Sequence, residues 1–274
     1  MSFSVLMSVY NKENPCFLDQ SIKSVFSQTL LPDELVVIKD GLLTKELDAV
    51  IEKYIENYNI KIYQFQNNVK LGLALRKGVE LCSNSIIARM DSDDIALQDR
   101  FEVEYNYLLS HPDISVVGSY IQEFYEEKQL GIKKMPISNN EIIQYSKLRN
   151  PMNHMTVMFR KEAVIASGNY HHFPLLEDYY LWSRMLVKGY KFNNIPKVLV
   201  MARTGMNMYN RRGGLHYFKN HLNLRNKQYK IGHLNLLEYV RAVIVSFAFT
   251  MCPSKIKQIL YTKLLRKSEE EVSM

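Results

Sequence analysis

Three carboxylates stand almost side by side in Asp91-Ser92-Asp93-Asp94, directly after the apolar run Ser85–Met90. Like charges this close repel one another, and a bound divalent cation would offset the repulsion. Carboxylate oxygens are the ligands that Mg²⁺ and Mn²⁺ prefer, and such ions often bridge to substrate phosphates. The alternative is a solvated loop in which one aspartate caps a helix beginning near Leu97. The cluster alone leaves these two interpretations evenly balanced.

The elements around the cluster favour a site. Short β-rich apolar runs alternate with amphipathic helical stretches, a pattern typical of a mostly parallel sheet covered by helices. Ligands of such open sheets bind beyond the carboxyl ends of the strands. We expect the first strands at Phe3–Val9, Glu34–Ile38, Lys61–Phe65 and Ser85–Met90. Polar residues follow each of them: Tyr10 and Asn11, then Asp40, then Asn67, and finally Asp91 to Asp94.

Further elements are expected in the second half of the chain. The pattern predicts a helix near Gln98–Ser110, strands at Ile114–Phe124 and Thr156–Phe159, and a helix over Asp178–Lys188. From about Gly213 onward the chain is expected to be wholly helical, with Pro253 separating two helices.

Composition narrows the class of protein. The chain has 274 residues, of which 47% are hydrophobic, enough for one large α/β domain or a medium domain with an appendage. Its three cysteines, Cys16, Cys82 and Cys252, are widely spaced without a CxxC pair, so neither a disulfide framework nor a zinc site is indicated. The first residues lack the features of a signal peptide. We therefore expect a cytoplasmic protein.

The net charge of +7 is unevenly distributed. Residues 203–267 contain 13 Lys and Arg but a single acidic residue, Glu238. This asymmetry suggests an anionic surface or ligand near that end of the chain, such as nucleic acid, phospholipid or diphosphate.

With these residues in place, the chain resembles the family 2 glycosyltransferases, which share the GT-A fold. The resemblance covers about residues 3–190. It is carried by Val9-Tyr10-Asn11, Lys39-Asp40-Gly41, the stretch from Asn67 to Gly78, Asp91-Ser92-Asp93-Asp94 and a later Glu-Asp motif within Leu176–Arg184. It implies a Rossmann-like, mostly parallel central sheet flanked by helices. The expected catalytic domain spans residues 1–212, with a nucleotide-sugar half (1–110) and an acceptor half (111–212), followed by a helical extension (213–274).

The resemblance also implies a nucleotide-sugar donor, expected to be a UDP-sugar, and Mn²⁺ or Mg²⁺. It assigns the ribose to Asp91 and the metal to Asp93, with Asp91 as a further candidate metal ligand. The expected donor-binding set also includes Val9, Tyr10, Asn11, Asp40, Lys70, Gly72, Arg76 and Ser92. The family's usual Asp-Asp-Gly-Ser is here Lys39-Asp40-Gly41-Leu42, a departure that bears on which base is bound.

Sugar transfer needs a base to remove the acceptor's proton, and enzymes similar to this chain invert the anomeric centre with one such carboxylate. Asp178 is the first candidate and Glu177 the second. Taken alone, the pair could simply complement the dipole of the helix that it begins. The acidic cluster upstream shifts the balance toward catalysis.

Four more residues are candidates for the donor site. Trp182 can stack on a sugar ring or pack into the core, with core packing slightly favoured. His154 is as often structural as functional. Arg211 and Arg212 suit a diphosphate because guanidinium groups match phosphate geometry, or they are simply exposed.

The nearest likeness is to bacterial capsule, exopolysaccharide and O-antigen glycosyltransferases of the amylovoran-type group, which implies a saccharide or undecaprenyl-diphosphate-linked acceptor. Residues Ala242–Cys252 are apolar but too short to span a bilayer. Beyond Pro253, an amphipathic basic helix is expected either to lie on anionic lipid or to pack on the domain. We favour peripheral association with the cytoplasmic face of the inner membrane.

Two other classes of protein are less well supported. A nucleotidyltransferase on a similar fold would usually carry a glycine-rich N-terminal signature, which is missing. A nucleic-acid-binding module is suggested by the pI of about 9.1, but the acidic cluster would repel phosphates without a metal. We therefore expect no nucleic-acid partner.

Overall fold

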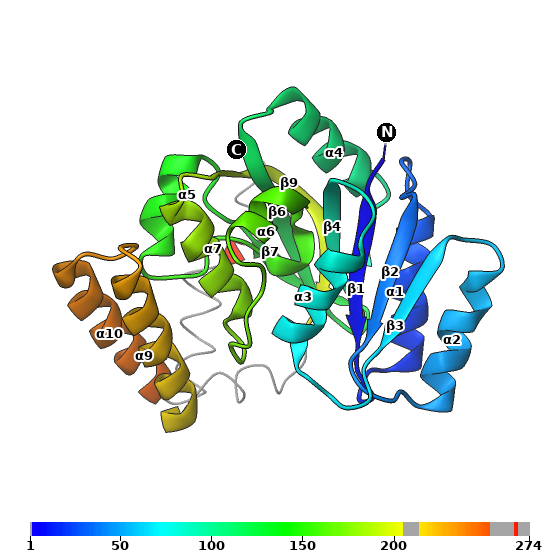
Figure 1. Cartoon of the computed structure of the whole chain (residues 1–274), viewed down its shortest axis with the longest axis horizontal. Helices are drawn as coiled ribbons and strands as arrows, with labels where there is room; N and C mark the ends of the chain where they lie inside the picture. Colours follow the sequence, from blue (N-terminus) through cyan, green and yellow to red (C-terminus); the bar gives the residue numbers. More distant parts are fainter. Residues whose placement is uncertain (1, 205–213, 253–265, 268–274) are drawn as a thin grey trace.

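The computed structural model describes residues 2–204, 214–252 and 266–267 (Figure 1). A ten-stranded mixed sheet forms the centre of the molecule, in the order β10-β7-β6-β8-β4-β1-β2-β3, with β5 and β9 joining off this path. The α/β architecture predicted from the sequence is confirmed. Its strands are β1 (Ser4–Val9), β2 (Glu34–Lys39), β3 (Ile60–Gln64), β4 (Ile86–Asp91), β5 (Ile95–Ala96), β6 (Ile114–Tyr125), β7 (Lys128–Lys133), β8 (Met158–Arg160), β9 (Lys191–Arg203) and β10 (Arg266–Lys267).

The four strands predicted in the first part of the chain all form and pair in parallel. Their carboxyl ends therefore lie at one edge of the sheet. Beyond them the pairing is mixed, because β8 runs antiparallel to both β4 and β6, whereas β6 and β9 are parallel. Thr156, expected at the start of a strand, lies instead in a short 3-10 helix, η1 (His154–Thr156).

Helices cover both faces of the sheet. Those before residue 204 are α1 (Pro15–Phe26), α2 (Lys45–Ile55), α3 (Leu71–Leu81), α4 (Arg100–Ser110), α5 (Asn139–Ser146), α6 (Lys161–Ala166) and α7 (Glu177–Val187). Local chemistry begins the first two: Asn14 accepts a hydrogen bond from the backbone of Cys16, with Pro15 in the first turn, and Thr44 caps α2. Each helix then lies where its apolar stripe meets the sheet.

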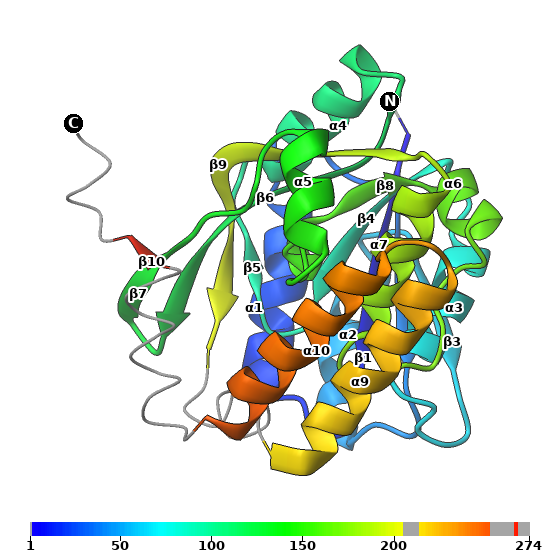
Figure 2. The same ribbon diagram turned by 90° about the vertical axis from the view of Figure 1, so that its left-hand side faces the viewer.

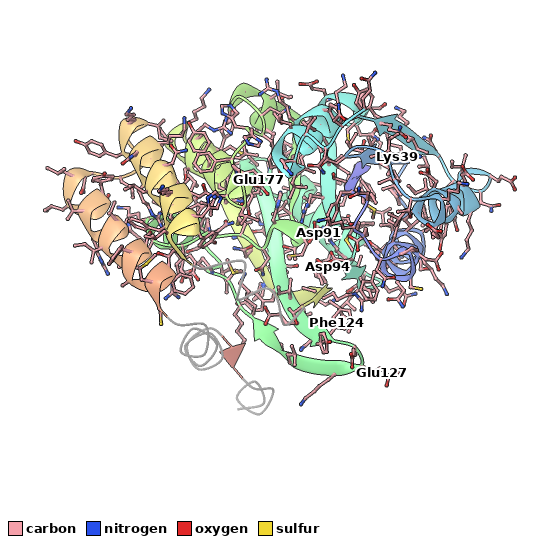
Figure 3. All side chains as sticks on the ribbon, turned by 90° about the horizontal axis from the view of Figure 1, so that it is seen from below. Lys39, Asp91, Asp94, Phe124, Glu127 and Glu177 are labelled. Atoms are coloured by element: carbon pink, nitrogen blue, oxygen red, sulfur yellow. The ribbon has the colours of Figure 1, made fainter. Side chains whose placement is uncertain are left out.

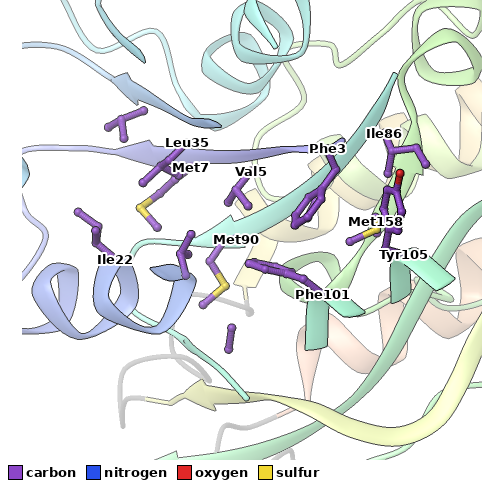
Figure 4. Packing of buried hydrophobic residues seen from close by; sticks show 14 of the residues in the cluster. Phe3, Val5, Met7, Ile22, Leu35, Ile86, Met90, Phe101, Tyr105 and Met158 are labelled. Carbon is purple, nitrogen blue, oxygen red and sulfur yellow. The ribbon is translucent and has the colours of Figure 1, made fainter. Parts of the chain in front are cut away.

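Alternation along β1 supplies two hydrophobic cores. Val5 and Met7 face the cluster formed with α1, α2 and α4, whereas Leu6 faces the cluster formed with α3, α6 and α7. In the first cluster, shown in Figure 4, the rings of Phe3 and Phe101 meet edge to face at 5.3 Å. A strand buried on both faces is held rigidly, so it fixes the position of the residues that follow its carboxyl end.

The C-terminal part is a helical hairpin of α9 (Gly214–Lys230) and α10 (Leu236–Met251), which lies outermost on one side of the molecule (Figures 1 and 2). Helical structure is thus confirmed for these two segments, but the prediction of a wholly helical C-terminal part is wrong at Arg266–Lys267, which form strand β10 and pair with β7. The helix expected beyond Pro253 lies outside the described residues. Within the described ranges, every helix is too short or too polar to cross a membrane.

Candidate active site at the carboxyl ends of the parallel strands

The acidic cluster lies where β4 ends. Asp91, Asp93 and Asp94 each offer a carboxylate oxygen, and these oxygens all lie within 4.8 Å of one another. Asp94 is buried, and its Oδ1 accepts a 2.7 Å hydrogen bond from the backbone N–H of Arg203. The Arg203 side chain donates to the carbonyl of Asp93 at 3.0 Å. The end of β9 therefore fixes the loop that carries the cluster.

Electrostatics at the cluster call for a cation. Burial raises the pKa of Asp93 to about 7, and the charges of Asp91 and Glu13 add to the shift. Burial also raises the pKa of Asp94 well above its usual range. Burial disfavours the charged forms of Asp93 and Asp94, and a bound divalent cation would favour them. Three neighbouring carboxylates are also suitable ligands for a hard divalent ion. The side chains present therefore fit Mg²⁺ or Mn²⁺.

Arg89 is a site residue that the sequence analysis missed. Its buried guanidinium donates to both oxygens of Asp91, with a distance of 2.7 Å from Nη1 to Oδ2. This two-pronged contact fixes the plane of the Asp91 carboxylate and leaves its outer lone pairs available. The available signal was a lone charge in an apolar strand, two residues before Asp91 and so on the same face.

Glu13 was also missed. Its Oε2 accepts a 2.6 Å hydrogen bond from the Ser92 hydroxyl, which brings the segment after β1 against the acidic cluster. Ser92, which was predicted to bind the nucleotide-sugar donor, is thus buried, and its hydroxyl is hydrogen-bonded to Glu13.

Asp40 and the end of β1 form the expected nucleoside side. The backbone N–H of Asp40 donates to the carbonyl of Val9 at 2.8 Å. The Asp40 carboxylate is buried and accepts from the Val69 backbone at 2.6 Å and from Asn68 Nδ2 at 2.9 Å. Burial raises the pKa of Asp40, and the N–H groups of the loop after β3 oppose that shift. The carboxylate therefore ties two strand ends together.

Neighbouring residues frame this side. Tyr10 and Asn11 are exposed just beyond Val9. Lys39, which replaces the family's first aspartate, forms a 2.7 Å ion pair with Asp48 of α2. The departure from the family pattern is thus accommodated inside this chain.

The start of α3 lies against α7. Lys70 is exposed and holds a positive φ of 73° where the helix begins. A Cβ on Gly72 would lie 2.2 Å from the carbonyl oxygen of His171 and 3.2 Å from Cβ of Glu177, so only glycine permits this approach. Arg76 points to the loop before α7, where its guanidinium donates to the carbonyls of Gly168 and Tyr170 at 3.3 Å each.

The predicted catalytic pair begins α7. Glu177 and Asp178 are both buried. Asp178 accepts a 2.5 Å hydrogen bond from Asn150 Nδ2 and a 2.7 Å bond from the Tyr179 backbone. Burial raises the pKa of both carboxyls, to about 7 for Glu177, where the charge of Asp178 contributes. A carboxylate of raised pKa is a stronger base, as proton abstraction requires.

His154 and Trp182 lie deeper. His154 Nε2 is 2.9 Å from the hydroxyl of Tyr170, and burial lowers the pKa of the imidazole well below its ordinary value, which favours the neutral ring. Trp182 is fully buried and packs edge to face on Phe192 at 5.6 Å. Of its two predicted uses, the structure therefore shows core packing. Arg211 and Arg212 lie outside the described residues.

The acidic cluster and the Glu177-Asp178 pair share one charged neighbour, Arg89. The charge of Arg89 favours ionisation of Asp93 and Asp94 on one side and of Glu177 and Asp178 on the other. Figure 3, viewed from below the strands, shows Asp91 and Asp94 near the centre with Glu177 to one side. The sheet edge thus combines three carboxylates that could hold a cation with a buried pair of carboxyls of raised pKa.

Comparisons with known proteins agree with this geometry. The model of the family described as "Glycosyl transferase family 2" matches residues 4–183. The amylovoran biosynthesis glycosyltransferase AmsE of Erwinia amylovora is 38% identical over 261 residues, covering 95% of this chain and 98% of that protein. The UDP-Gal:alpha-D-GlcNAc-diphosphoundecaprenol beta-1,3-galactosyltransferase of Escherichia coli is 34% identical over 266 residues, or 97% of each chain.

Solved structures are similar in fold. The crystal structure of Staphylococcus aureus TarS 1-349 in complex with UDP-GlcNAc superposes with a TM-score of 0.69 at 16% identity, covering 99% of this chain and 78% of that one. The mannosyltransferase of Pyrobaculum calidifontis in complex with GDP-Man and Mn²⁺ gives 0.66 at 11% identity, covering 99% and 77%.

Proposed function

The chain belongs to glycosyltransferase family 2, and on that premise we propose that it transfers a sugar from a UDP-sugar to a lipid-linked saccharide, with inversion at the anomeric carbon. The observation that carries the proposal is the meeting of two carboxylate groups with different tasks around Arg89. One group suits a cation and the donor diphosphate, and the other suits removal of a proton.

On the donor side, Asp93 and Asp91 would hold Mn²⁺ or Mg²⁺, which stabilises negative charge on the leaving diphosphate. Asp91, oriented by Arg89, presents its outer lone pairs to the ribose hydroxyls. Tyr10 and Asn11 are exposed where the nucleoside would lie, beside Asp40. The structural neighbour bound to UDP-GlcNAc supports a UDP-sugar in this place.

On the acceptor side, Asp178 takes the proton of the attacking hydroxyl. Its oxygens are held by Asn150 and by the Tyr179 backbone, so the carboxylate needs no reorientation as the bond forms. The proton ends on Asp178, the glycosidic bond forms on the face opposite the diphosphate, and UDP leaves. A single base on the acceptor side gives inversion, so an α-linked donor yields a β-linked product.

One relative supports the proposed acceptor class. The Escherichia coli relative is named for transfer from UDP-Gal to GlcNAc-diphosphoundecaprenol. A similar acceptor here would bring the reaction to the cytoplasmic face of the inner membrane, in the synthesis of a bacterial surface polysaccharide. The basic C-terminal quarter of the chain agrees with such an anionic surface.

A direct test combines a panel of UDP-sugars, Mn²⁺ or Mg²⁺, and a short-chain GlcNAc-diphospholipid acceptor. Wild type is expected to transfer one sugar and to form a β linkage by NMR coupling. Asp93→Ala and Asp178→Ala should each lower kcat/KM by about a hundredfold or more. Asp19→Ala, at a partly exposed aspartate of α1 that pairs with Lys53, is the matched control. Undiminished transfer in both site variants would overturn the assignment.

A further inference from the structure

The pattern of apolar and polar side chains on helix α10 is the reverse of that on an ordinary surface helix. The residues that face the protein are small or polar, namely Ala242, Ser246 and Thr250, spaced four apart. The large apolar side chains point outward: Leu237 is 81% exposed and Ile244 62%. A helix that only covered a domain would carry the opposite pattern. The outward apolar face therefore needs a separate explanation.

Polar contacts hold the hairpin in place without using that face. Arg225 of α9 is buried and donates to the carbonyl of Leu148 at 2.7 Å, the hydroxyl of Tyr179 at 2.9 Å and the hydroxyl of Ser246 at 3.3 Å. Asn235 and Glu238 form a capping box at the start of α10. The outer face is thus carried on a firmly anchored support.

The exposed side chains form one continuous surface, which we call the α10 face. Leu236, Leu237, Val240, Ile244 and Val245 line a shallow apolar depression together with Arg241. Phe247 continues the surface toward the end of the helix and is half exposed. Figure 2 shows α9 and α10 as the outermost layer on that side. Contiguous apolar surfaces of this kind mark interaction sites.

Charge decides between the possible occupants. Helix α9 contains no acidic residue, and the single one in α10, Glu238, is paired with Lys147. Arg241 lies within the α10 face, and Lys219 and Lys230 are exposed on α9. Packed against the same face of a second copy, these cations would meet no carboxylate. An anionic lipid surface offers both acyl chains for the apolar residues and phosphates for the cations.

We infer that the α10 face docks on an anionic lipid bilayer, with the helix axis parallel to the membrane plane. The inference rests on the proposed function, because a lipid-linked acceptor brings the enzyme to the bilayer. It goes further by naming the docking surface, which differs from the segment beyond Pro253 that the sequence suggested. The face carries no residue of the acidic cluster or of the Glu177-Asp178 pair.

Vesicle sedimentation of the full chain tests the inference. Wild type is expected to cosediment with phosphatidylethanolamine–phosphatidylglycerol vesicles more than with phosphatidylcholine vesicles. High salt should lower its cosedimentation with the anionic vesicles. The double variant Leu237→Glu/Ile244→Glu should lower partitioning by about tenfold or more. Leu31→Glu/Leu109→Glu is the matched control, because both leucines are about half exposed and lie outside the hairpin. Unchanged thermal unfolding establishes that each variant is folded.

Two further measurements separate the possible failures. Transfer to a water-soluble acceptor should be equal in wild type and in the α10-face variant. If no sugar is transferred but the variant still loses vesicle binding, the proposed function fails and the docking surface stands. Unchanged vesicle binding in the variant would overturn the docking inference. So would light scattering that shows a dimer for wild type and a monomer for the variant, if wild type does not bind vesicles.

Discussion

The side-chain amide of Asn150 donates a 2.5 Å hydrogen bond to Oδ2 of Asp178, joining the loop before η1 to the start of α7. The Tyr179 backbone donates to the other oxygen. Both donors favour the charged carboxylate, whereas burial favours the neutral acid and raises the pKa of Asp178. The strength of the proposed base is therefore set by a balance that Asn150 controls.

Replacing Asn150 with leucine removes this hydrogen-bond donor and puts an apolar side chain of similar size in its place. The pKa of Asp178 should rise, because the hydrogen bond that lowers it is lost. The base works when deprotonated, so the acidic limb of the kcat/KM profile should move to higher pH. At neutral pH the rate should fall by about tenfold to a hundredfold. Asn106→Leu, at an exposed position of α4, is the control, and an unmoved acidic limb would contradict the role of Asn150.

Neutralising each member of the α7 pair distinguishes their roles. Burial and the charge of Asp178 raise the pKa of Glu177 to about 7, and the two carboxyls influence each other. Glu177→Gln removes a negative neighbour, so the pKa of Asp178 should fall and the acidic limb of the rate profile should move to lower pH. Asp178→Asn should instead lower kcat by about a hundredfold or more at every pH. If the two variants behave the other way round, Glu177 is the base.

The sequence predicted the first half of the fold well because β1, β2 and β4 are buried on both faces and appear as apolar runs. Strand β9 carries no such pattern: it contains Asn193, Asn194, Pro196 and Lys197, and long-range pairing with β6 holds it. The predicted metal cluster comes from neighbours in sequence, so it too was visible.

The residues that support the site were not predicted from the sequence. Glu13, Arg89 and Asn150 have roles only because of partners that lie 79, 2 and 28 positions away in the chain. Arg89 is close to its partner, yet its contact with Asp91 depends on the strand placing both side chains on one face. Trp182 shows the converse: a residue type suited to stacking on sugars is enclosed by the core that its helix forms.

Metal binding should depend on pH through Asp93. Burial and nearby carboxylates raise the pKa of Asp93 to about 7, so protons compete with a cation below that pH. Mn²⁺ should therefore raise the Tm of wild type more at pH 8 than at pH 6, since a ligand stabilises the state that it binds. Asp93→Asn should lose most of the Mn²⁺ effect. Asp19→Asn, at an aspartate paired with Lys53, should keep it. An equal Mn²⁺ response in wild type and Asp93→Asn would remove Asp93 from the metal site.

Gly72→Ala tests whether the close approach of α3 to α7 matters for catalysis. The added Cβ would lie 2.2 Å from the carbonyl oxygen of His171 and 3.2 Å from Cβ of Glu177, so the start of α3 must move away from the loop before α7 and from the start of α7. We expect a loss of about 1–3 kcal/mol in the free energy of unfolding, together with a fall in kcat because the Glu177-Asp178 pair moves with α7.

Gly78→Ala in the same helix is the matched control. Its Cβ would meet Cδ1 of Leu6 in β1, also at 2.2 Å, and Cγ1 of Ile38 in β2 at 3.1 Å, whereas the Cβ at Gly72 would meet His171 and Glu177. Both variants should unfold at lower denaturant concentration than wild type. Only Gly72→Ala should also lose kcat under conditions where each protein is fully folded. If the two variants lose kcat equally, or if Gly72→Ala retains full activity, the start of α3 does not position the catalytic pair.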